Sequence, residues 1–264
     1  MLKLSHSSLQ LFQTCPKKYY YQRIEKWASR ISALPLARGK AIHEALDHFY
    51  KTKSTEEATE KAIASITQEA LLPQEKEAIT PIVKDTLALY FQDQEIYDFQ
   101  VIDSEIDKSK QLTEDVVYVG KIDTIVNFRG MEFLRETKTT TQIASQWEQK
   151  YSLDNQTLGY LWLLDGKVPG IILDLIRIPD GKKTKYPEFV RSSYFPHPHL
   201  LAEWEEERTG LAKVIQAATR GEIPFAKNTA SCFDYNRACG FFPFCSKSLS
   251  ESELPNLFTK RTDI

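Results

Sequence analysis

The chain has 264 residues, of which 42% are hydrophobic and 27% are charged. This composition is typical of a globular protein and excludes an intrinsically disordered chain. The formal net charge is −2, so the strong positive charge of many nucleic-acid-binding proteins is absent. No apolar run approaches the ~18 residues that span a membrane, and Met1–Gln10 has no signal-like apolar region. We therefore expect a soluble, cytoplasmic protein without a membrane partner.

The first hundred residues are predicted to be mainly helical. Ser5 or Ser7 can cap a short helix that ends at Cys15, because Pro16 disfavours the α conformation in the residue before it. Further along, apolar residues recur at the three- and four-residue spacing of helices. The helices predicted from this spacing cover about 39–51, 55–72 and 75–97.

The pattern changes after Phe99, where β-branched and aromatic residues become frequent. Arg129-Gly130 supplies a turn between the last two of three predicted antiparallel strands. These strands cover 99–106, 115–128 and 131–138. The elements predicted after them are a helix at about 152–165, a strong strand at 170–178, a weaker strand near 189–195 and a helix at about 198–220.

Neither an internal repeat nor an evident linker divides the chain. We therefore predict a single α/β domain over 1–264, with a mixed central sheet flanked by helices. Within it, 1–98 is a mainly helical N-terminal part and 99–221 is the core that carries the sheet. The C-terminal segment, 222–264, contains three of the four cysteines.

Two carboxylates and one ammonium are predicted to converge near the turn at 129–130. Glu136 and Lys138 lie two apart in a predicted strand, so their side chains leave the same face of the sheet. The hairpin brings Asp123 toward Glu136. Such a group suits a divalent cation held by oxygen ligands, with Lys138 near an attacking water. The alternative is the exposed, charged face of a half-solvated strand.

A series of motifs along the chain favours the first of these interpretations. In order, they are Leu4-Ser5-His6-Ser7-Ser8-Leu9 with Cys15-Pro16, Gly39-Lys40-Ala41-Ile42-His43, Gly120-Lys121-Ile122-Asp123, Glu136-Thr137-Lys138 and Gln156-Thr157-Leu158-Gly159-Tyr160. The series resembles the PD-(D/E)XK nuclease superfamily, and within it the RecB-like branch that includes the AddB nuclease domain and the iron–sulfur nucleases of CRISPR adaptation. The resemblance implies a restriction-endonuclease-like core and metal-dependent hydrolysis of DNA, and we expect an exonuclease.

The resemblance also implies which groups bind the catalytic cation. The implied ligands are His43, Asp123, Glu136 and the main-chain carbonyl of Thr137. The implied cation is Mg²⁺ or Mn²⁺, and an imidazole ligand favours Mn²⁺. For His43, the alternative is an ordinary histidine on a helix.

Three further residues have roles by the same resemblance. Lys138 would orient or deprotonate the attacking water. Gln156 and Tyr160 lie four apart on one helical face and would position Lys138 or the DNA backbone. The alternative for these two is an amphipathic helix with a half-buried tyrosine.

The four cysteines are split between the two ends of the chain. Cys15 lies near the start, and Cys232, Cys239 and Cys245 lie near the end. Because disulfides are rare inside cells, a cysteine cluster there indicates a metal or iron–sulfur site. By the resemblance, the four thiolates bind a [4Fe–4S] cluster that joins the two ends. Structural zinc is less favoured because no C-x₂₋₄-C pair is present, and unpaired buried thiols are the third alternative.

The weaker candidates are one glutamate and two groups of lysines. Glu105 is a further carboxylate on the preceding strand, but spacing does not fix its distance from Asp123. Two lysine groups could contact phosphates, with tyrosines stacking on bases; a solvated loop and core tyrosines are equally consistent. These groups are Lys182, Lys183 and Lys185, and Lys17 and Lys18 beside Tyr19, Tyr20 and Tyr21.

Two rival functions and a partner class follow from the same sequence. The rivals are a non-catalytic DNA-binding or scaffold subunit that retains the fold, and an interaction protein stapled by zinc. The chain has no G-x-x-x-x-G-K-[ST] motif, so an ATP-driven motor would be a separate protein. Besides DNA, we therefore expect a partner such as a helicase or another protein of recombination, repair or CRISPR adaptation.

Overall fold

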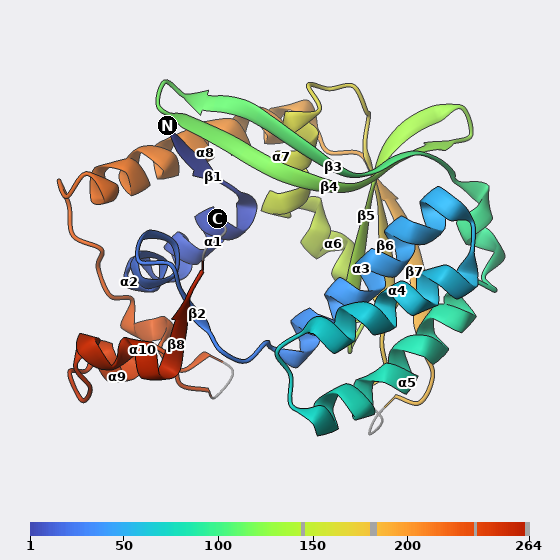
Figure 1. Ribbon diagram of the computed structural model, residues 1–264. Coiled ribbons are helices and arrows are strands. Elements are labelled where there is room, and N and C mark those ends of the chain that lie inside the picture. The colour runs from blue at the N-terminus through green and yellow to red at the C-terminus, as the bar shows by residue number, and fades with distance from the viewer. Residues whose placement is uncertain (144–145, 180–183, 235–236, 262–264) are drawn as a thin grey trace. The chain divides into compact units, whose positions relative to one another are not determined.

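A mixed β-sheet organises the fold in the computed structural model, which describes residues 1–143, 146–179, 184–234 and 237–261 (Figure 1). The strands pair in the order β1-β4-β5-β6-β7, and β3 pairs with β4. They are β1 (Leu2–Leu4), β3 (Gln100–Thr113), β4 (Val116–Phe128), β5 (Met131–Thr140), β6 (Ile171–Arg177) and β7 (Glu188–Tyr194). The mixed sheet with flanking helices that the sequence predicts is confirmed.

The sheet contains both parallel and antiparallel pairs. β5 is antiparallel to β4 and parallel to β6, while β6 is antiparallel to β7. Parallel neighbours need a crossover connection, and helices α6 (Trp147–Ser152) and α7 (Asn155–Leu163) provide it between β5 and β6. The sequence predicted one helix at 152–165 where the structure has these two. They are separate because Asp154 is extended and caps α7, its carboxylate accepting from the N–H groups of Gln156 and Thr157.

The residues group into two compact units. The first unit comprises Met1–Ile31, Ser109–Val119 and Glu205–Ile264, and the second unit comprises Ser32–Lys108 and Gly120–Trp204. The assignment of 1–264 to one domain, with parts at 1–98, 99–221 and 222–264, stays a prediction.

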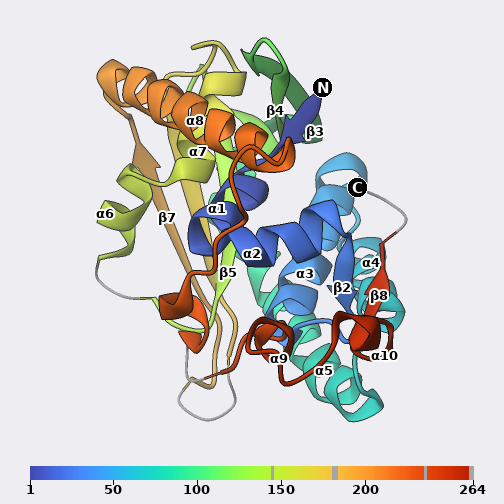
Figure 2. The ribbon, with the colours of Figure 1, turned by 90° about the vertical axis from the view of Figure 1, so that its left-hand side faces the viewer.

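In the second unit, helices cover both faces of strands β5 and β6 (Figure 2). One face carries α3 (Leu34–Thr52), α4 (Thr55–Gln68) and α5 (Pro73–Tyr90), whose apolar residues form one core with Ile176 of β6. The other face carries α6 and α7, with Tyr151 packed against Leu173 and Leu175. Side chains of β5 therefore alternate between the two helical layers.

A buried ionic network lies on the α5 side of this unit. Arg135 is fully buried and donates to the Asp174 carboxylate at 2.5 Å and to the Tyr90 hydroxyl at 2.6 Å. Tyr90 also donates to Asp174, and Arg191 Nε lies 3.0 Å from the same carboxylate. A buried charge is tolerated only when it is paired in this way. The network holds β5 in place at Arg135. The next residue, Glu136, has its side chain on the opposite face, toward the other helical layer.

The first unit contains the cysteine-bearing segments. Its helical elements are α1 (His6–Thr14), α2 (Pro16–Tyr19), a π-helical turn at Tyr20–Ile24, most of α8 (Pro198–Thr219), α9 (Phe242–Cys245), α10 (Leu254–Leu257) and 3₁₀ turns at Thr229–Ser231 and Glu251–Glu253. Strands β2 (Trp27–Ser29) and β8 (Phe258–Lys260) pair antiparallel. Phe241 stacks between Tyr21 and Phe258, so aromatic packing holds the start and the end of the chain together.

Several local predictions are confirmed, and one predicted strand is shorter than the strand in the structure. Ser5 accepts from the Ser8 N–H and caps α1, which ends at Thr14 with Cys15 extended before Pro16. Strand β3 runs to Thr113, although its predicted end was residue 106. Its second half is polar and has little intrinsic strand preference, so pairing with β4 extends it.

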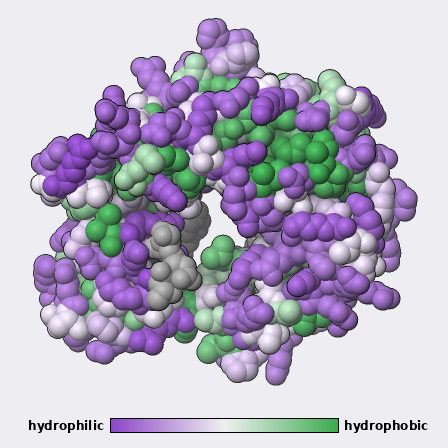
Figure 3. Space-filling view, turned by 45° about the horizontal axis from the view of Figure 1, so that its top comes forward, coloured by the Kyte–Doolittle hydropathy of each residue, from purple (hydrophilic) through white to green (hydrophobic). Residues whose placement is uncertain are grey.

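Among the described residues, no helix combines the length and the apolar character needed to cross a bilayer. The face in Figure 3 is mostly hydrophilic, with apolar patches between the polar side chains.

Candidate active site

The predicted carboxylates meet where strands β4 and β5 stop pairing. The ladder between these strands runs from Phe128 opposite Met131 to Thr124 opposite Arg135. Asp123 and Glu136 are the next residues of the two strands. Asp123 Oδ2 accepts a hydrogen bond from the main-chain N–H of Thr137 at 3.0 Å. The hairpin thus brings Asp123 to the Glu136-Thr137 segment, as the sequence predicts.

A chain of hydrogen bonds extends from Glu136 to helix α7. Lys138 Nζ donates to Glu136 Oε1 at 2.5 Å and to Gln156 Oε1 at 2.6 Å. Gln156 Nε2 in turn donates to the Tyr160 hydroxyl at 2.9 Å. The structure therefore brings together four of the predicted site residues, and Gln156 contacts Lys138 directly. Glu136 is 1% exposed, so the reading of Glu136 as part of an open charged face does not apply.

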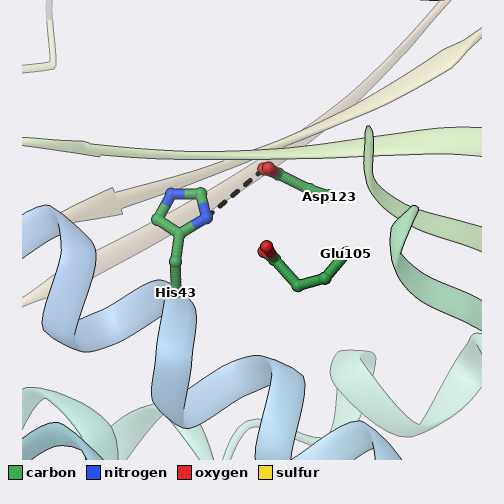
Figure 4. Close-up of side chains that lie close together, drawn as sticks. All are labelled: His43, Glu105 and Asp123. Carbon is green, nitrogen blue, oxygen red and sulfur yellow. Dashed lines mark ion pairs between the residues drawn. The ribbon is translucent and has the colours of Figure 1, made fainter. Parts of the chain in front are cut away.

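Histidine and a third carboxylate join Asp123 from other elements (Figure 4). His43 comes from α3, and its Nδ1 lies 3.5 Å from Asp123 Oδ2. Glu105 comes from β3, and one ligand atom from each of the three residues lies within 4.8 Å of the others. Among the described residues this is the one group of three or more metal-ligating side chains at that separation, and Glu136 is not part of it.

Two glycines of the motifs allow helices to approach the sheet closely. A Cβ on Gly120 of β4 would lie 2.8 Å from atoms of both Tyr160 and Leu163 on α7. A Cβ on Gly39 of α3 would lie 3.0 Å from the Thr139 hydroxyl on β5. Real Cβ atoms do not approach other atoms to 2.8 Å, so a side chain at Gly120 would force the side chains of Tyr160 and Leu163 to shift. The glycines thus set the distances at which α3 and α7 carry their functional residues.

Burial makes both central carboxyls weak acids in the absence of a cation. Burial raises the pKa of Glu136 to about 7, with a further rise from the Asp123 carboxylate against the opposing effect of Lys138. Burial likewise raises the pKa of Asp123 to about 6, with Lys138 opposing. The site therefore takes up protons at neutral pH unless another positive charge arrives.

The pKa values of the two neighbouring basic groups, His43 and Lys138, shift in opposite directions. Burial lowers the pKa of His43, although Glu136 opposes this, so the imidazole is neutral at pH 7 and can act as a ligand. Burial also tends to lower the pKa of Lys138, but the carboxylates of Glu136 and Asp123 together outweigh it and the net pKa is raised. Lys138 is consequently an ammonium group at neutral pH.

The donor set fits a divalent cation. Glu136 Oε2 is a buried carboxylate oxygen that accepts no hydrogen bond from any described residue. A buried charged oxygen without a partner is strongly unfavourable, so an unpaired position of this kind suits a cation. Carboxylate oxygens and one imidazole match the ligand preferences of Mg²⁺ and Mn²⁺, with the imidazole favouring Mn²⁺. The carbonyl oxygen of Thr137 lies in the same segment of β5.

The four cysteines line one cavity within the first unit. This cavity has a volume of about 190 Å³, and Lys18 and Lys227 also line it. The main-chain N–H of Asn228 donates to Cys15 Sγ at 3.5 Å, and the Asn228 amide donates to the Thr14 carbonyl at 2.8 Å. All four thiols are free, and burial raises the pKa of the Cys245 thiol. The tertiary structure thus brings Cys15 to the C-terminal cysteines, as the sequence suggested.

The lysines and tyrosines that were weaker candidates for DNA contact lie in different environments. Tyr19 and Tyr21 are 2% and 1% exposed, so these rings belong to the core and are closed to bases. Lys17 Nζ lies over the ring of Tyr20, 4.3 Å from its centroid. Lys185 is exposed, while Lys182 and Lys183 fall outside the described residues.

Glu105 is the site residue that sequence reasoning did not assign. Its strand was predicted, but no motif includes it and its backbone has a positive φ of 54°. A glutamate carries no sequence signal for that conformation, which is uncommon outside glycine and asparagine. Only the fold shows that its carboxylate faces His43 and Asp123.

Comparison with known proteins identifies the family of this chain. A family model of the PD-(D/E)XK nuclease superfamily matches residues 3–246. A candidate exonuclease from Eubacterium rectale, known from a crystal structure, has a similar fold: the TM-score is 0.60 at 12% identity, covering 90% of this chain and 89% of that chain. The crystal structure of SSO0001 gives a TM-score of 0.45 at 16% identity, covering 94% and 87%. No curated protein matches the chain. Since the family model matches well over half of its length, this chain belongs to the PD-(D/E)XK nuclease superfamily.

Proposed function

We propose that this protein is a divalent-metal-dependent deoxyribonuclease of the RecB/AddB-like branch, acting as an exonuclease. The observation that supports this best is the position of Lys138 Nζ, held between Glu136 Oε1 and Gln156 Oε1. The second oxygen of Glu136 meanwhile lacks a hydrogen-bond donor among the described residues. A scaffold subunit that only retained the fold would have no need of this costly arrangement.

The cation would be held by the side chains of His43, Asp123 and Glu136 and by the carbonyl of Thr137. Bound there, Mg²⁺ or Mn²⁺ would polarise the scissile phosphate and lower the pKa of a water molecule. Glu136 and Asp123 would be ionised in that state, because a dication opposes the burial that otherwise raises the pKa of both carboxyls.

Lys138 would orient the reacting groups. Its pKa is raised, so at neutral pH its ammonium group donates hydrogen bonds and has no free position to accept a proton. We therefore assign it to holding the attacking water or a phosphate oxygen, in preference to deprotonating the water. In the reaction the attacking water would give a proton to solvent as its oxygen bonds to phosphorus. The bond from phosphorus to the leaving sugar oxygen would break, and that oxygen would take up a proton from solvent. Gln156 and Tyr160 would keep Lys138 in position through the hydrogen bonds described above.

The substrate and the setting extend this proposal. The substrate would be DNA, and exonuclease action is also the activity in the name of the Eubacterium rectale protein of similar fold. The partner would be a helicase or another protein of recombination, repair or CRISPR adaptation, and the location would be the cytoplasm.

The decisive experiment is a cleavage assay with matched variants. Anaerobically purified protein is incubated with end-labelled single- and double-stranded DNA and with Mn²⁺, Mg²⁺ or EDTA. We expect metal-dependent cleavage that falls by about 100-fold or more in Glu136→Ala and Lys138→Ala. Glu132→Ala is the control, since Glu132 is exposed on the same strand. Retained cleavage in either site variant would contradict the assignment, and inactivity of the parent with both metals would favour the scaffold subunit.

We further propose that the four cysteines bind a [4Fe–4S] cluster that staples the two ends of the chain. The cavity that they line has a volume of about 190 Å³, and Lys18 and Lys227, which also line it, suit an anionic cluster. Zinc is less favoured because the chain has no C-x₂₋₄-C pair.

Metal analysis of the purified protein distinguishes a [4Fe–4S] cluster from zinc. We expect iron and acid-labile sulfide in equal amounts, with absorbance near about 400 nm. One equivalent of zinc without visible absorbance would establish the zinc-stapled alternative. Protein purified anaerobically with neither metal would leave four unpaired thiols and would refute both.

A further inference from the structure

Glu105 occupies a position that the proposed catalytic roles leave unexplained. Its carboxylate, His43 Nδ1 and the Asp123 carboxylate lie within 4.8 Å of one another, and the three side chains point toward a common centre (Figure 4). Glu105 itself forms an ion pair with Lys121, whose Nζ lies 3.0 Å from Glu105 Oε2. The ordinary reading of such a pair is a surface salt bridge with no further role.

The backbone at Glu105 argues against that ordinary reading. Its φ of 54° places a bulky residue in the left-handed region inside a strand. Consecutive strand residues normally face opposite sides, yet both Ser104 and Glu105 face helix α3 here. Ser104 Oγ donates to Asp47 Oδ1 at 2.6 Å, and Glu105 lies beside His43, one turn earlier on the same helix. The unusual φ therefore turns the carboxylate toward His43 and Asp123.

The ion pair with Lys121 does not account for this backbone. A bulky residue in the left-handed conformation is strained, because its side chain crowds the neighbouring carbonyl. The Lys121 side chain is 56% exposed, and an exposed ion pair contributes little stability. A ligand that needs the Glu105 carboxylate at this place would supply the missing stabilisation.

An independent observation shows that a positive charge is missing next to this group. Glu136 is 1% exposed, and its Oε2 has no hydrogen-bond donor among the described residues. The next residue of the strand, Thr137, donates its main-chain N–H to Asp123, so Glu136 lies next to the group of His43, Glu105 and Asp123. Lys138 is bonded to the other oxygen of Glu136, and Lys121 is bonded to Glu105.

We propose that Glu105 is a further carboxylate ligand of the divalent cation and that Lys121 competes with the cation for it. This rests on the proposed function, because it concerns the cation of the same site. In the metal-free state Lys121 neutralises Glu105. When the cation binds, Glu105 exchanges its ion pair for a metal–oxygen contact and the exposed Lys121 ammonium returns to water. Lys121, the second residue of Gly120-Lys121-Ile122-Asp123, thereby sets the cation affinity.

The experiment measures Mn²⁺ binding to the full chain directly, with Mn²⁺ as the probe and electron paramagnetic resonance counting the free ion. We expect Glu105→Gln to weaken binding by about tenfold or more, since ligand charge sets cation affinity. Lys121→Met should tighten binding by several-fold. In the double variant the benefit of Lys121→Met should vanish, because Lys121 acts through Glu105. Asp107→Asn is the matched control: it removes an exposed charge from the same strand, and binding should change less than about twofold.

A second variant at the same position tests whether weaker binding comes from loss of the carboxylate and not from misfolding. Glu105→Gly removes the same carboxylate and accepts the positive φ without strain, so it should fold and still bind Mn²⁺ weakly. Circular dichroism and thermal melting in EDTA verify that each variant is folded.

The possible failures are distinguishable through Asp123→Asn. Loss of Mn²⁺ binding in Asp123→Asn, with unchanged binding in Glu105→Gln and Glu105→Gly, would overturn the role of Glu105 alone. Unchanged or weakened binding in Lys121→Met would overturn the competition. If Asp123→Asn also bound Mn²⁺ like the parent, the cation site of the proposed function would itself be wrong.

Discussion

Asp123 Oδ2 accepts a hydrogen bond of 3.0 Å from the main-chain N–H of Thr137, just beyond the last paired residues of β4 and β5. This contact connects the two motif strands where their ladder ends. Because the donor is a main-chain N–H group, the orientation of the Asp123 carboxylate does not depend on the conformation of another side chain. The same contact places Asp123 beside the Glu136-Thr137-Lys138 segment from which the proposed water-positioning ammonium comes.

His43 is expected to be a cation ligand. His43→Ala should weaken Mn²⁺ affinity by about tenfold or more, because even outer-shell partners of a metal contribute 10–100-fold. Cleavage should then recover partly at higher Mn²⁺ concentration. The control is His48→Ala, since His48 lies on the same helix but pairs with Glu57 at 2.9 Å. An Mn²⁺ titration of His43→Ala that superimposed on the parent would return His43 to the status of an ordinary helix histidine.

Gln156 is expected to position Lys138. Gln156→Leu removes the acceptor of the 2.6 Å hydrogen bond from Lys138, so kcat should fall by about 10–100-fold while Mn²⁺ affinity stays the same. Gln156→Glu keeps an acceptor and should rescue much of the loss, with a pH profile shifted by the added charge. Tyr160→Phe keeps the ring that packs against Gly120 and should cost less. A Gln156→Leu enzyme with unchanged kcat would rule out this positioning role.

Metal-free protein is expected to lose stability as pH rises from about 5 to 8. The folded-state pKa values of Glu136, about 7, and Asp123, about 6, lie above the values of the unfolded chain, roughly 4. Below the unfolded values both states are protonated. Between the two sets the folded state holds more protons, so the free energy of unfolding falls as pH rises through the folded pKa values. The charged groups that face Glu136 are Lys138, Asp123 and His43.

For Glu136 alone this effect is on the order of 2–3 kcal/mol, because about two pH units lie between pH 5 and its folded-state pKa and one unit corresponds to about 1.4 kcal/mol. For a chain of this length that is several degrees in melting temperature. Calorimetry in EDTA between pH 5 and 8 measures it, and Mn²⁺ should raise the melting temperature more at pH 8 than at pH 5.5. Glu136→Gln should flatten the dependence on pH. Equal slopes in that variant and in the parent would show that Glu136 does not titrate in this range.

Cys15 is expected to be a cluster ligand. Cys15→Ser should lower iron content, absorbance and melting temperature together and speed proteolysis at both ends of the chain. A link between residues 15 and 232 closes a loop of more than two hundred residues, which is ~5 kcal/mol of unfolded-state entropy. This is comparable with the whole stability of a domain. Residual cleavage at low temperature should remain, because Cys15 is not among the proposed catalytic residues.

The control for this variant is Ser231→Ala, which changes another residue lining the cavity without removing a thiol. It should keep the iron and the melting temperature of the parent. Equal iron and an equal melting temperature in Cys15→Ser and the parent would mean that Cys15 is not a ligand, and the staple would have to be abandoned.

The sequence alone determined the features that depend on local rules. The two-residue period of a strand places Glu136 and Lys138 on one face, and the structure has both side chains there. Ser5 and Pro16 bound the first helix as predicted, because capping and the restriction before proline act between near neighbours. The motif series likewise led to the prediction of Asp123 and Gln156 as site residues, since their types and spacing lie within single segments.

Only the tertiary structure decided the features that depend on distant segments. Residue spacing carries no information on the distance between β3 and α3, so the approach of Glu105 to His43 and Asp123 could not be predicted. The cavity of the four cysteines depends in the same way on packing between the two ends of the chain. Arg135 is a third case: its full burial follows from Asp174, a partner almost forty residues away. Local rules fix which face a side chain takes, whereas packing of remote elements fixes what it meets there.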